Sequence, residues 1–120
     1  MDRLKKRADF VRVATGRKEV TPGLIVQALA RAEDAVPGPE APCRVGFTVT
    51  RKVGNAVERN RVRRRLVALS RALLPRYARN GTDYVLVGRR AALTRDYERL
   101  LDDLERALIK LGPPHRPGDR

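Results

Sequence analysis

Three consecutive segments carry the clearest structural signals in the chain: CRVGFTVT (residues 43–50), NAVERNRVRRRLVALSRALL (residues 55–74) and DYVLV (residues 83–87). The first alternates apolar residues with small or polar ones, which is typical of a strand with one buried face. The second repeats apolar residues every three or four positions, as a helix does when one side faces a core. The third is a short apolar run, typical of a buried strand. Together they predict a βαβ unit, for which general rules favour a right-handed crossover.

The same patterns assign residues to faces. In the first strand, the predicted core face consists of Val45, Phe47 and Val49, and the opposite face of Arg44, Gly46, Thr48 and Thr50. The buried stripe of the helix consists of Val62, Leu66, Leu69 and Leu73. At about 100° per residue, the side opposite this stripe carries Asn60, Arg61, Arg64 and Arg71, with Arg59 and Arg65 nearer its flanks. Pro75 is expected to end or kink this helix, which opens at Gly54-Asn55.

The flanking sequence predicts two more helices and at least one more strand. A helix over Leu4–Ala14 is expected to end at Gly16. The segment Leu24–Ala32 fits a strand or a helix, and we interpret it as a strand. Thr94 is expected to cap a last helix. Its apolar stripe consists of Tyr97, Leu101, Leu104, Leu108 and Leu111.

These elements predict a single α/β (α+β) domain over residues 1–111. The expected architecture is a two-layer sandwich with a small mixed central sheet and three helices, in the order α-β-β(-β)-α-β-α. A loop rich in proline and acidic residues is expected over 33–42, and a disordered tail over 112–120.

Length and composition exclude several classes of protein. The 120 residues fit one domain. No stretch approaches ~18 consecutive apolar residues, which excludes a transmembrane helix. The basic N-terminal segment lacks an apolar signal core, so we expect a cytoplasmic protein. The single cysteine, Cys43, excludes an intramolecular disulfide and a multi-cysteine zinc site.

Positive charge is concentrated in two segments. The formal net charge is +13; residues 1–18 contribute +5 and residues 51–79 contribute +9. Most of the basic residues are arginine, whose planar guanidinium grips phosphate with two hydrogen bonds. A dense cluster of cations creates a strong local potential for a polyanion. Nucleic acid is therefore the leading partner, ahead of an anionic membrane surface.

The residues offer little for catalysis by the protein itself. The only histidine, His115, lies in the Pro-rich tail, where no scaffold holds it as a general base. Asp102, Asp103 and Glu105 are interpreted as a solvated face that pairs with basic residues of the last helix, Arg99 and Arg106. Cys43 has no histidine partner and is interpreted as an inert thiol. We therefore expect no catalytic or metal-binding residue in the protein.

Binding signals are stronger. Residues 51–65 hold seven Lys/Arg beside the start of a helix, where backbone N–H groups already favour phosphate. A merely solvated basic face is the alternative, but crowded cations repel one another unless an anion binds them. Phe10 lies in a basic helix and is the best candidate for stacking on an unpaired base, with core packing an equal alternative. Tyr77 stays undecided, and Phe47, Tyr84 and Tyr97 fit packing roles.

The segment RKVGNAVERNRVRRRL (residues 51–66) resembles the signature of the bacterial ribonuclease P protein component, centred on Arg59-Asn60-Arg61. The resemblance extends to LKKRADF (4–10), RVGFTVTRKVGNAV (44–57) and DYVLVGRR (83–90). It implies an α/β sandwich with a left-handed βαβ crossover.

The resemblance also implies a function. Members of this family act in a cytoplasmic ribonucleoprotein that removes the 5′ leader from precursor tRNA. In it the ribonuclease P RNA performs the hydrolysis with Mg²⁺, which the RNA subunit and the substrate mainly hold. The protein binds this RNA and the single-stranded leader of precursor tRNA, and no obligate protein partner or membrane is expected.

Site residues follow from the resemblance position by position. The implied contact with the RNA subunit consists of Arg51, Lys52, Asn55, Arg59, Asn60, Arg61, Arg64 and Arg65. The implied leader-binding cleft consists of Phe10, Thr48, Thr50 and Arg89. Ala14 and Gln27 stand where the family often has aromatics, so leader stacking is expected to be weaker here and arginine to supply more of the affinity.

Two other functional classes compete with this one. The charge would equally suit a structural RNA-binding protein, such as a ribosomal component or an RNA chaperone. A free-standing nuclease is disfavoured, because the sequence offers no acid–base pair.

Overall fold

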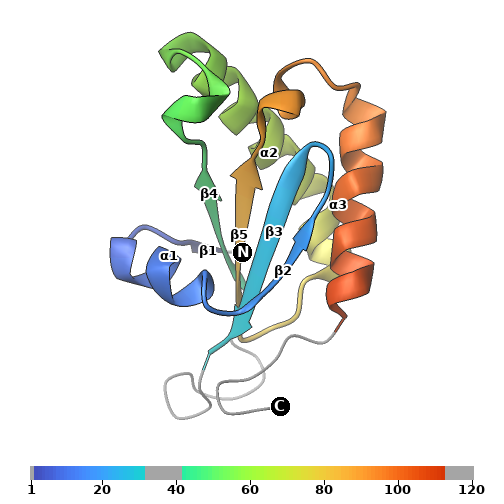
Figure 1. Cartoon of the computed structure of the whole chain (residues 1–120). Helices are drawn as coiled ribbons and strands as arrows, with labels where there is room; N and C mark the ends of the chain where they lie inside the picture. The colour runs from blue at the N-terminus through green and yellow to red at the C-terminus, as the bar shows by residue number, and fades with distance from the viewer. Residues whose placement is uncertain (1, 32–41, 113–120) are drawn as a thin grey trace.

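The computed structural model describes residues 2–31 and 42–112 (Figure 1). Apart from Pro42 and Gly112, the predicted loop over 33–42 and the predicted tail over 112–120 lie outside the described residues. The described elements are, in chain order, β1 (Asp2–Arg3), α1 (Arg7–Val13), β2 (Arg17–Val20), β3 (Leu24–Ala30), β4 (Arg44–Thr48), the short 3-10 helix η2 (Arg51–Val53), α2 (Ala56–Tyr77), β5 (Thr82–Gly88), the 3-10 helix η3 (Arg90–Leu93) and α3 (Tyr97–Leu111). This is an α+β fold with three α-helices and a mixed sheet, as predicted.

The sheet has the strand order β1-β4-β5-β3-β2. β4 runs parallel to β1 and to β5, whereas β3 is antiparallel to β5 and β2 is antiparallel to β3. In Figure 1, α2 passes behind the sheet and β5 lies to the right of β4, so the βαβ crossover is left-handed. A right-handed crossover would put α2 on the face that α1 occupies and would separate it from α3. The general expectation is therefore wrong here, and the hand implied by the resemblance is confirmed.

One face of the sheet carries the main core. All four residues of the predicted stripe on α2 are buried, and Val62, Leu66 and Leu69 are fully so. They belong to one apolar cluster with Val45 and Phe47 of β4 and with residues of α3. The strand alternation and the helical periodicity thus identified the correct faces.

The opposite face is covered only in part, by α1 (Figure 1). Leu4, Val13 and Val85 form a second buried cluster, against which Phe10 packs. A Cβ atom at Gly46 would lie 2.5 Å from Cζ of Phe10. Glycine at this position therefore lets the Phe10 ring lie directly on β4.

The first half of the chain departs from the predicted boundaries. The first helix begins at Arg7 rather than at Leu4, because Leu4 follows β1 and donates its N–H to the carbonyl of Val45 at 2.9 Å. Neither β1 nor β2 was assigned a range from the sequence. Both are short edge strands, and the alternation in β2 covers only four residues.

The two long helices differ at their ends. α2 continues through Pro75 to Tyr77, so Pro75 does not end it. A proline in the last turn removes only one hydrogen bond at an end that is already fraying. The residue before α3 is Asp96 rather than Thr94, and Tyr97 is 38% exposed while Leu100 is fully buried. Near the start of α3, the buried side of the helix is therefore shifted by one residue from the predicted stripe.

Candidate RNA interface

The start of α2 is fixed by a capping box. The Asn55 side chain accepts a hydrogen bond from the Glu58 N–H at 2.9 Å, and the Glu58 carboxylate accepts one from the Asn55 N–H at 3.0 Å. This arrangement satisfies two N–H groups that a helix start otherwise leaves unpaired. Glu58 is the only acidic residue of segment 51–79, and it is engaged with backbone rather than with a neighbouring arginine.

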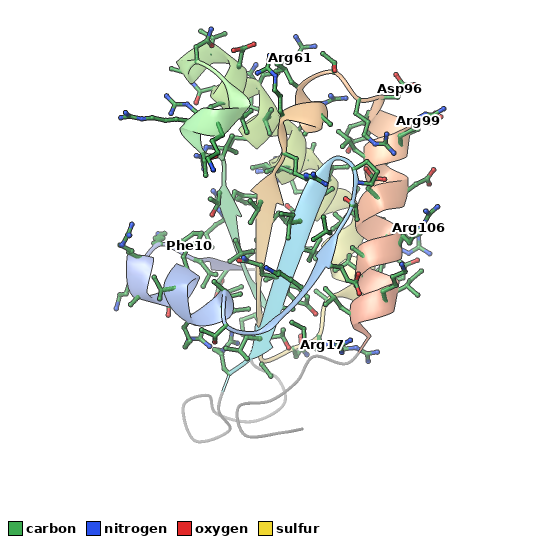
Figure 2. The ribbon with its side chains drawn as sticks, viewed as in Figure 1. Phe10, Arg17, Arg61, Asp96, Arg99 and Arg106 are labelled. Carbon is green, nitrogen blue, oxygen red and sulfur yellow. The ribbon has the colours of Figure 1, made fainter. Side chains whose placement is uncertain are left out.

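Five basic side chains at this end of the molecule have no hydrogen-bond or ion-pair partner among the described residues. They are Arg51, Lys52, Arg59, Arg61 and Arg64. We call them the α2 cation surface. Arg61 and Arg64 are exposed on the side of α2 that turns away from the sheet, and Figure 2 shows Arg61 beside the N-terminal part of this helix. Asn60 is exposed on the same helix.

Arg65 is placed differently from its neighbours. It is half-buried, and its guanidinium donates to the carbonyl of Ala92 at 2.7 Å. Arg90 donates to the carbonyl of Val53, which ties η3 to η2. Both side chains thus hold the loops around the start of α2, a role that local sequence does not reveal because the carbonyls lie far away along the chain.

A hollow lies on the other face of the sheet, beside α1. It has a volume of about 420 Å³ and is lined by Lys5, Arg7, Phe10, Val11 and Thr48. Phe10 and Thr48 are thus brought together as expected, and Figure 2 shows Phe10 between α1 and the sheet. Lys5, Arg7 and Val11 were not singled out from the sequence. All three lie close to Phe10 in the basic N-terminal segment, and this proximity could have identified them.

Two other residues of the implied leader cleft do not line this hollow. Thr50 is exposed at the start of η2. Arg89 is exposed and donates to the carbonyl of Thr21 at 2.7 Å, which ties it to the turn between β2 and β3. Ala14 ends α1 and is exposed, and Gln27 lies on β3 in register with Val85.

Buried carboxylates in the described structure bind arginine. Asp83 accepts hydrogen bonds from Arg12, Arg31 and Arg44. Burial alone would raise the pKa of Asp83, but the hydrogen bonds from Arg44 and Arg31 lower it below its ordinary value. Its stabilising contribution is therefore present at neutral pH and is lost as pH falls through this lowered pKa.

The predicted solvated acidic face of α3 is wrong in two places. Asp103 is buried and accepts hydrogen bonds from Arg95 at 2.8 Å and from the Gly23 N–H at 3.1 Å. Glu105 accepts a hydrogen bond from the Tyr77 hydroxyl at 2.9 Å, which also gives Tyr77 a packing role. Arg99 lies 4.0 Å from Asp96 rather than beside the predicted acids.

The described residues do not fit a metal site or a nucleophile. No group of three or more His, Cys, Asp or Glu that could hold a metal is found among them. Burial raises the pKa of the half-buried Cys43 thiol, which disfavours the reactive thiolate. His115 lies outside the described residues. In the part of the chain that is described, no helix is both long and apolar enough to cross a membrane.

Comparison with known proteins identifies the family of the chain. The family model for ribonuclease P matches residues 1–112. The ribonuclease P protein component of Gluconacetobacter diazotrophicus is 50% identical over 111 residues, covering 92% of this chain and 90% of its own length. That of Caulobacter vibrioides is 43% identical over 110 residues, covering 92% of this chain and 70% of its own length.

Solved structures show the same fold. The ribonuclease P protein of Staphylococcus aureus superimposes with a TM-score of 0.73 at 23% identity, over 92% of this chain and 94% of that one. The protein from Thermotoga maritima gives a TM-score of 0.70 at 22% identity, over 88% of this chain and 94% of that one. The chain therefore belongs to the family of bacterial ribonuclease P protein components, the protein subunits that aid 5′ maturation of precursor tRNA.

Proposed function

We propose that this protein binds the catalytic ribonuclease P RNA through the α2 cation surface and holds the single-stranded 5′ leader of precursor tRNA in the hollow beside α1. The RNA subunit performs the hydrolysis, and the protein raises the affinity for the substrate. Mg²⁺ is held by the RNA subunit and the substrate. A cytoplasmic location fits this role and fits a lone, unpaired cysteine.

The observation that carries the proposal is the unneutralised charge at the start of α2. Its five basic side chains have no partner among the described residues, although the same fold pairs many other arginines internally. Cations that are kept close together repel one another, so a polyanion that binds them relieves this repulsion. Each guanidinium can form two hydrogen bonds with a phosphate, and an RNA backbone offers phosphates at regular intervals.

The chemistry of the described acids supports assigning catalysis to the RNA. Two-metal cleavage of a phosphodiester needs several carboxylates that converge on one point. The buried carboxylates, Asp83 and Asp103, are instead bound by arginines on different sides of the sheet. The residues present therefore do not fit a metal centre, and the protein's contribution lies in binding.

The hollow beside α1 suits a single strand of nucleic acid. It combines an aromatic ring, Phe10, with the cationic side chains Lys5 and Arg7 and with the hydroxyl of Thr48. Aromatic faces stack on bases of any sequence, and cations nearby follow the backbone. Thr50 and Arg89 lie outside this hollow, and we keep them as contacts for leader nucleotides further along the strand.

Reconstitution tests the proposed function as a whole. The purified chain is incubated with precursor tRNA and low Mg²⁺, with and without a transcript of ribonuclease P RNA. We expect 5′ cleavage only when both subunits are present. Cleavage by the protein alone would indicate that it is itself a nuclease. If adding the protein did not change cleavage by the RNA, it would be a general RNA-binding protein instead.

Replacing Arg61 and Arg64 together by alanine should weaken assembly with the RNA subunit, because two phosphate contacts are lost. The slope of log K against log salt concentration should become shallower by roughly 1.4 to 1.8. The matched control is Arg106→Ala with Lys110→Ala on α3, which removes the same charge from exposed side chains elsewhere. An equal loss of affinity for the RNA subunit in both double variants would mean that only the net charge of the protein matters.

Replacing Phe10 by alanine should weaken binding of leader-bearing precursor by roughly 5- to 150-fold, the range of one lost base stack, and leave mature tRNA little affected. Phe10→Tyr keeps the aromatic ring and should therefore keep the preference for leader-bearing precursor over mature tRNA. Binding is measured with the assembled holoenzyme, after urea unfolding has established that each variant is folded. If precursor and mature tRNA lose affinity equally, Phe10 is a packing residue only.

A further inference from the structure

Asp83 is an unusual residue for a protein with so large a positive charge. Its side chain is fully buried at 0% exposure on β5, yet it accepts hydrogen bonds from three arginines. Arg44 binds it with two nitrogens, Nε at 2.8 Å and Nη2 at 2.7 Å. A carboxylate removed from water needs such complete pairing to offset its desolvation.

The three arginines come from three different elements. Arg31 directly follows β3 and Arg44 begins β4, so these two join strands that already neighbour β5 in the sheet. Arg12 lies on α1, and its Nη2 reaches the Oδ2 atom of Asp83. Asp9, also on α1, lies 3.8 Å from Arg44 and so extends the network toward the same helix.

α1 has little else to fix its position. It has seven residues, which is too short to be stable on its own in water. Its apolar contacts with the sheet come from Val13, which clusters with Val85 of β5, and from Phe10, which packs on Gly46 of β4. Among the described residues, two side-chain ion pairs attach the helix that carries Phe10 to the sheet: Arg12 binds the buried Asp83, and Asp9 lies 3.8 Å from Arg44.

We propose that Asp83 is a positioning residue for leader binding: through Arg12 it holds α1 at the angle that presents Phe10 to the hollow. This inference rests on the proposed leader site. Asp83 touches no substrate, and its carboxylate acts on the leader only through the orientation of α1. The ring of Phe10 packs on Gly46 from the middle of α1, and Arg12 fixes the helix near its C-terminal end.

A direct role for Arg12 is the competing explanation, because its side chain is 36% exposed and the two carboxylates, Asp83 and Asp9, do not neutralise all three guanidiniums. A double-mutant cycle separates the two. Asp83→Asn keeps the charge of Arg12 and removes its anchor, whereas Arg12→Ala removes the charge and leaves Arg31 and Arg44 on Asp83. If Asp83 acts by positioning α1, both single variants should lose preference for leader-bearing precursor over mature tRNA by a similar factor, about 5-fold or more.

The double variant Arg12→Ala with Asp83→Asn should then be no worse than either single variant, because residues that act through one contact are not additive. The salt slope of precursor binding should stay unchanged in Arg12→Ala. The proposal is overturned if Arg12→Ala loses the preference for precursor over mature tRNA while Asp83→Asn keeps it. It is also overturned if the salt slope of precursor binding in Arg12→Ala falls by about 1, as the loss of a phosphate contact requires.

The matched control is the exposed pair of Asp96, just before α3, and Arg99 on α3, which lie 4.0 Å apart. Both are far from Phe10 in Figure 2. Asp96→Asn, Arg99→Ala and their combination change the same charges and should leave leader preference unaltered. Loss of preference in this set too would assign the effect to net charge and overturn the proposal.

Hydrogen exchange gives a readout that does not depend on leader binding and remains usable if Asp83→Asn is destabilised. In Arg12→Ala, amides of α1 such as Ala14, whose N–H donates to the Phe10 carbonyl at 3.1 Å, should exchange faster while those of α2 do not change. Unchanged exchange in α1 would overturn the positioning role. Faster exchange without any leader preference in the parent protein would instead contradict only the proposed leader site.

Discussion

Repulsion between arginines is the constraint on which the rest of this structure depends. A chain of 120 residues with a net charge of +13 gains stability only if its cations are kept apart or neutralised. Among the described residues, two buried carboxylates do this internally: Asp83 and Asp103 bind arginines on opposite sides of the sheet. Other arginines, such as Arg65 and Arg90, donate to backbone carbonyls of the loops beside α2. The cations left without partners at the start of α2 are those we assign to RNA.

The topology keeps the two proposed binding surfaces on different sides of one sheet. α2 and α3 cover one face (Figure 1), and the α2 cation surface lies on η2 and on the first turns of α2. In the described part of the chain, α1 covers the other face in part and leaves the hollow next to Phe10. The left-handed crossover is essential to this division, because it puts α2 and α1 on opposite faces. This separation is what the proposed function requires, since it has one small domain bind a folded RNA and a single strand at the same time.

Sequence periodicity predicted the parts of the fold that depend on local pattern. The stripe from Val62 to Leu73 and the alternation in β4 were confirmed, since each is a long repeat with a single buried side. Short elements escaped prediction: β1 has two residues and is defined by pairing with β4 rather than by its own pattern. The start of α3 was misplaced because Tyr97 is apolar enough to fit a core stripe, and only packing against the sheet selects Leu100 instead.

Charges were harder to predict than apolar faces. The sequence placed Asp103 in a solvated face, but its partners, Arg95 and Gly23, come together only in the folded chain. The candidate site was predictable where residues share one helix, as Arg61 and Arg64 do. Arginines such as Arg65, which donate to carbonyl groups distant in sequence, could be told apart from those proposed to bind RNA only with the structure.

Arginine modification with phenylglyoxal, read by mass spectrometry in the free protein and in the complex with ribonuclease P RNA, tests the central claim most directly. Arg59, Arg61 and Arg64 should react in the free protein and become protected when the RNA binds. Arg99 and Arg106, on the outer side of α3 in Figure 2, should stay reactive in both states. Protection of the α3 arginines, with Arg61 and Arg64 still reactive in the complex, would contradict the account.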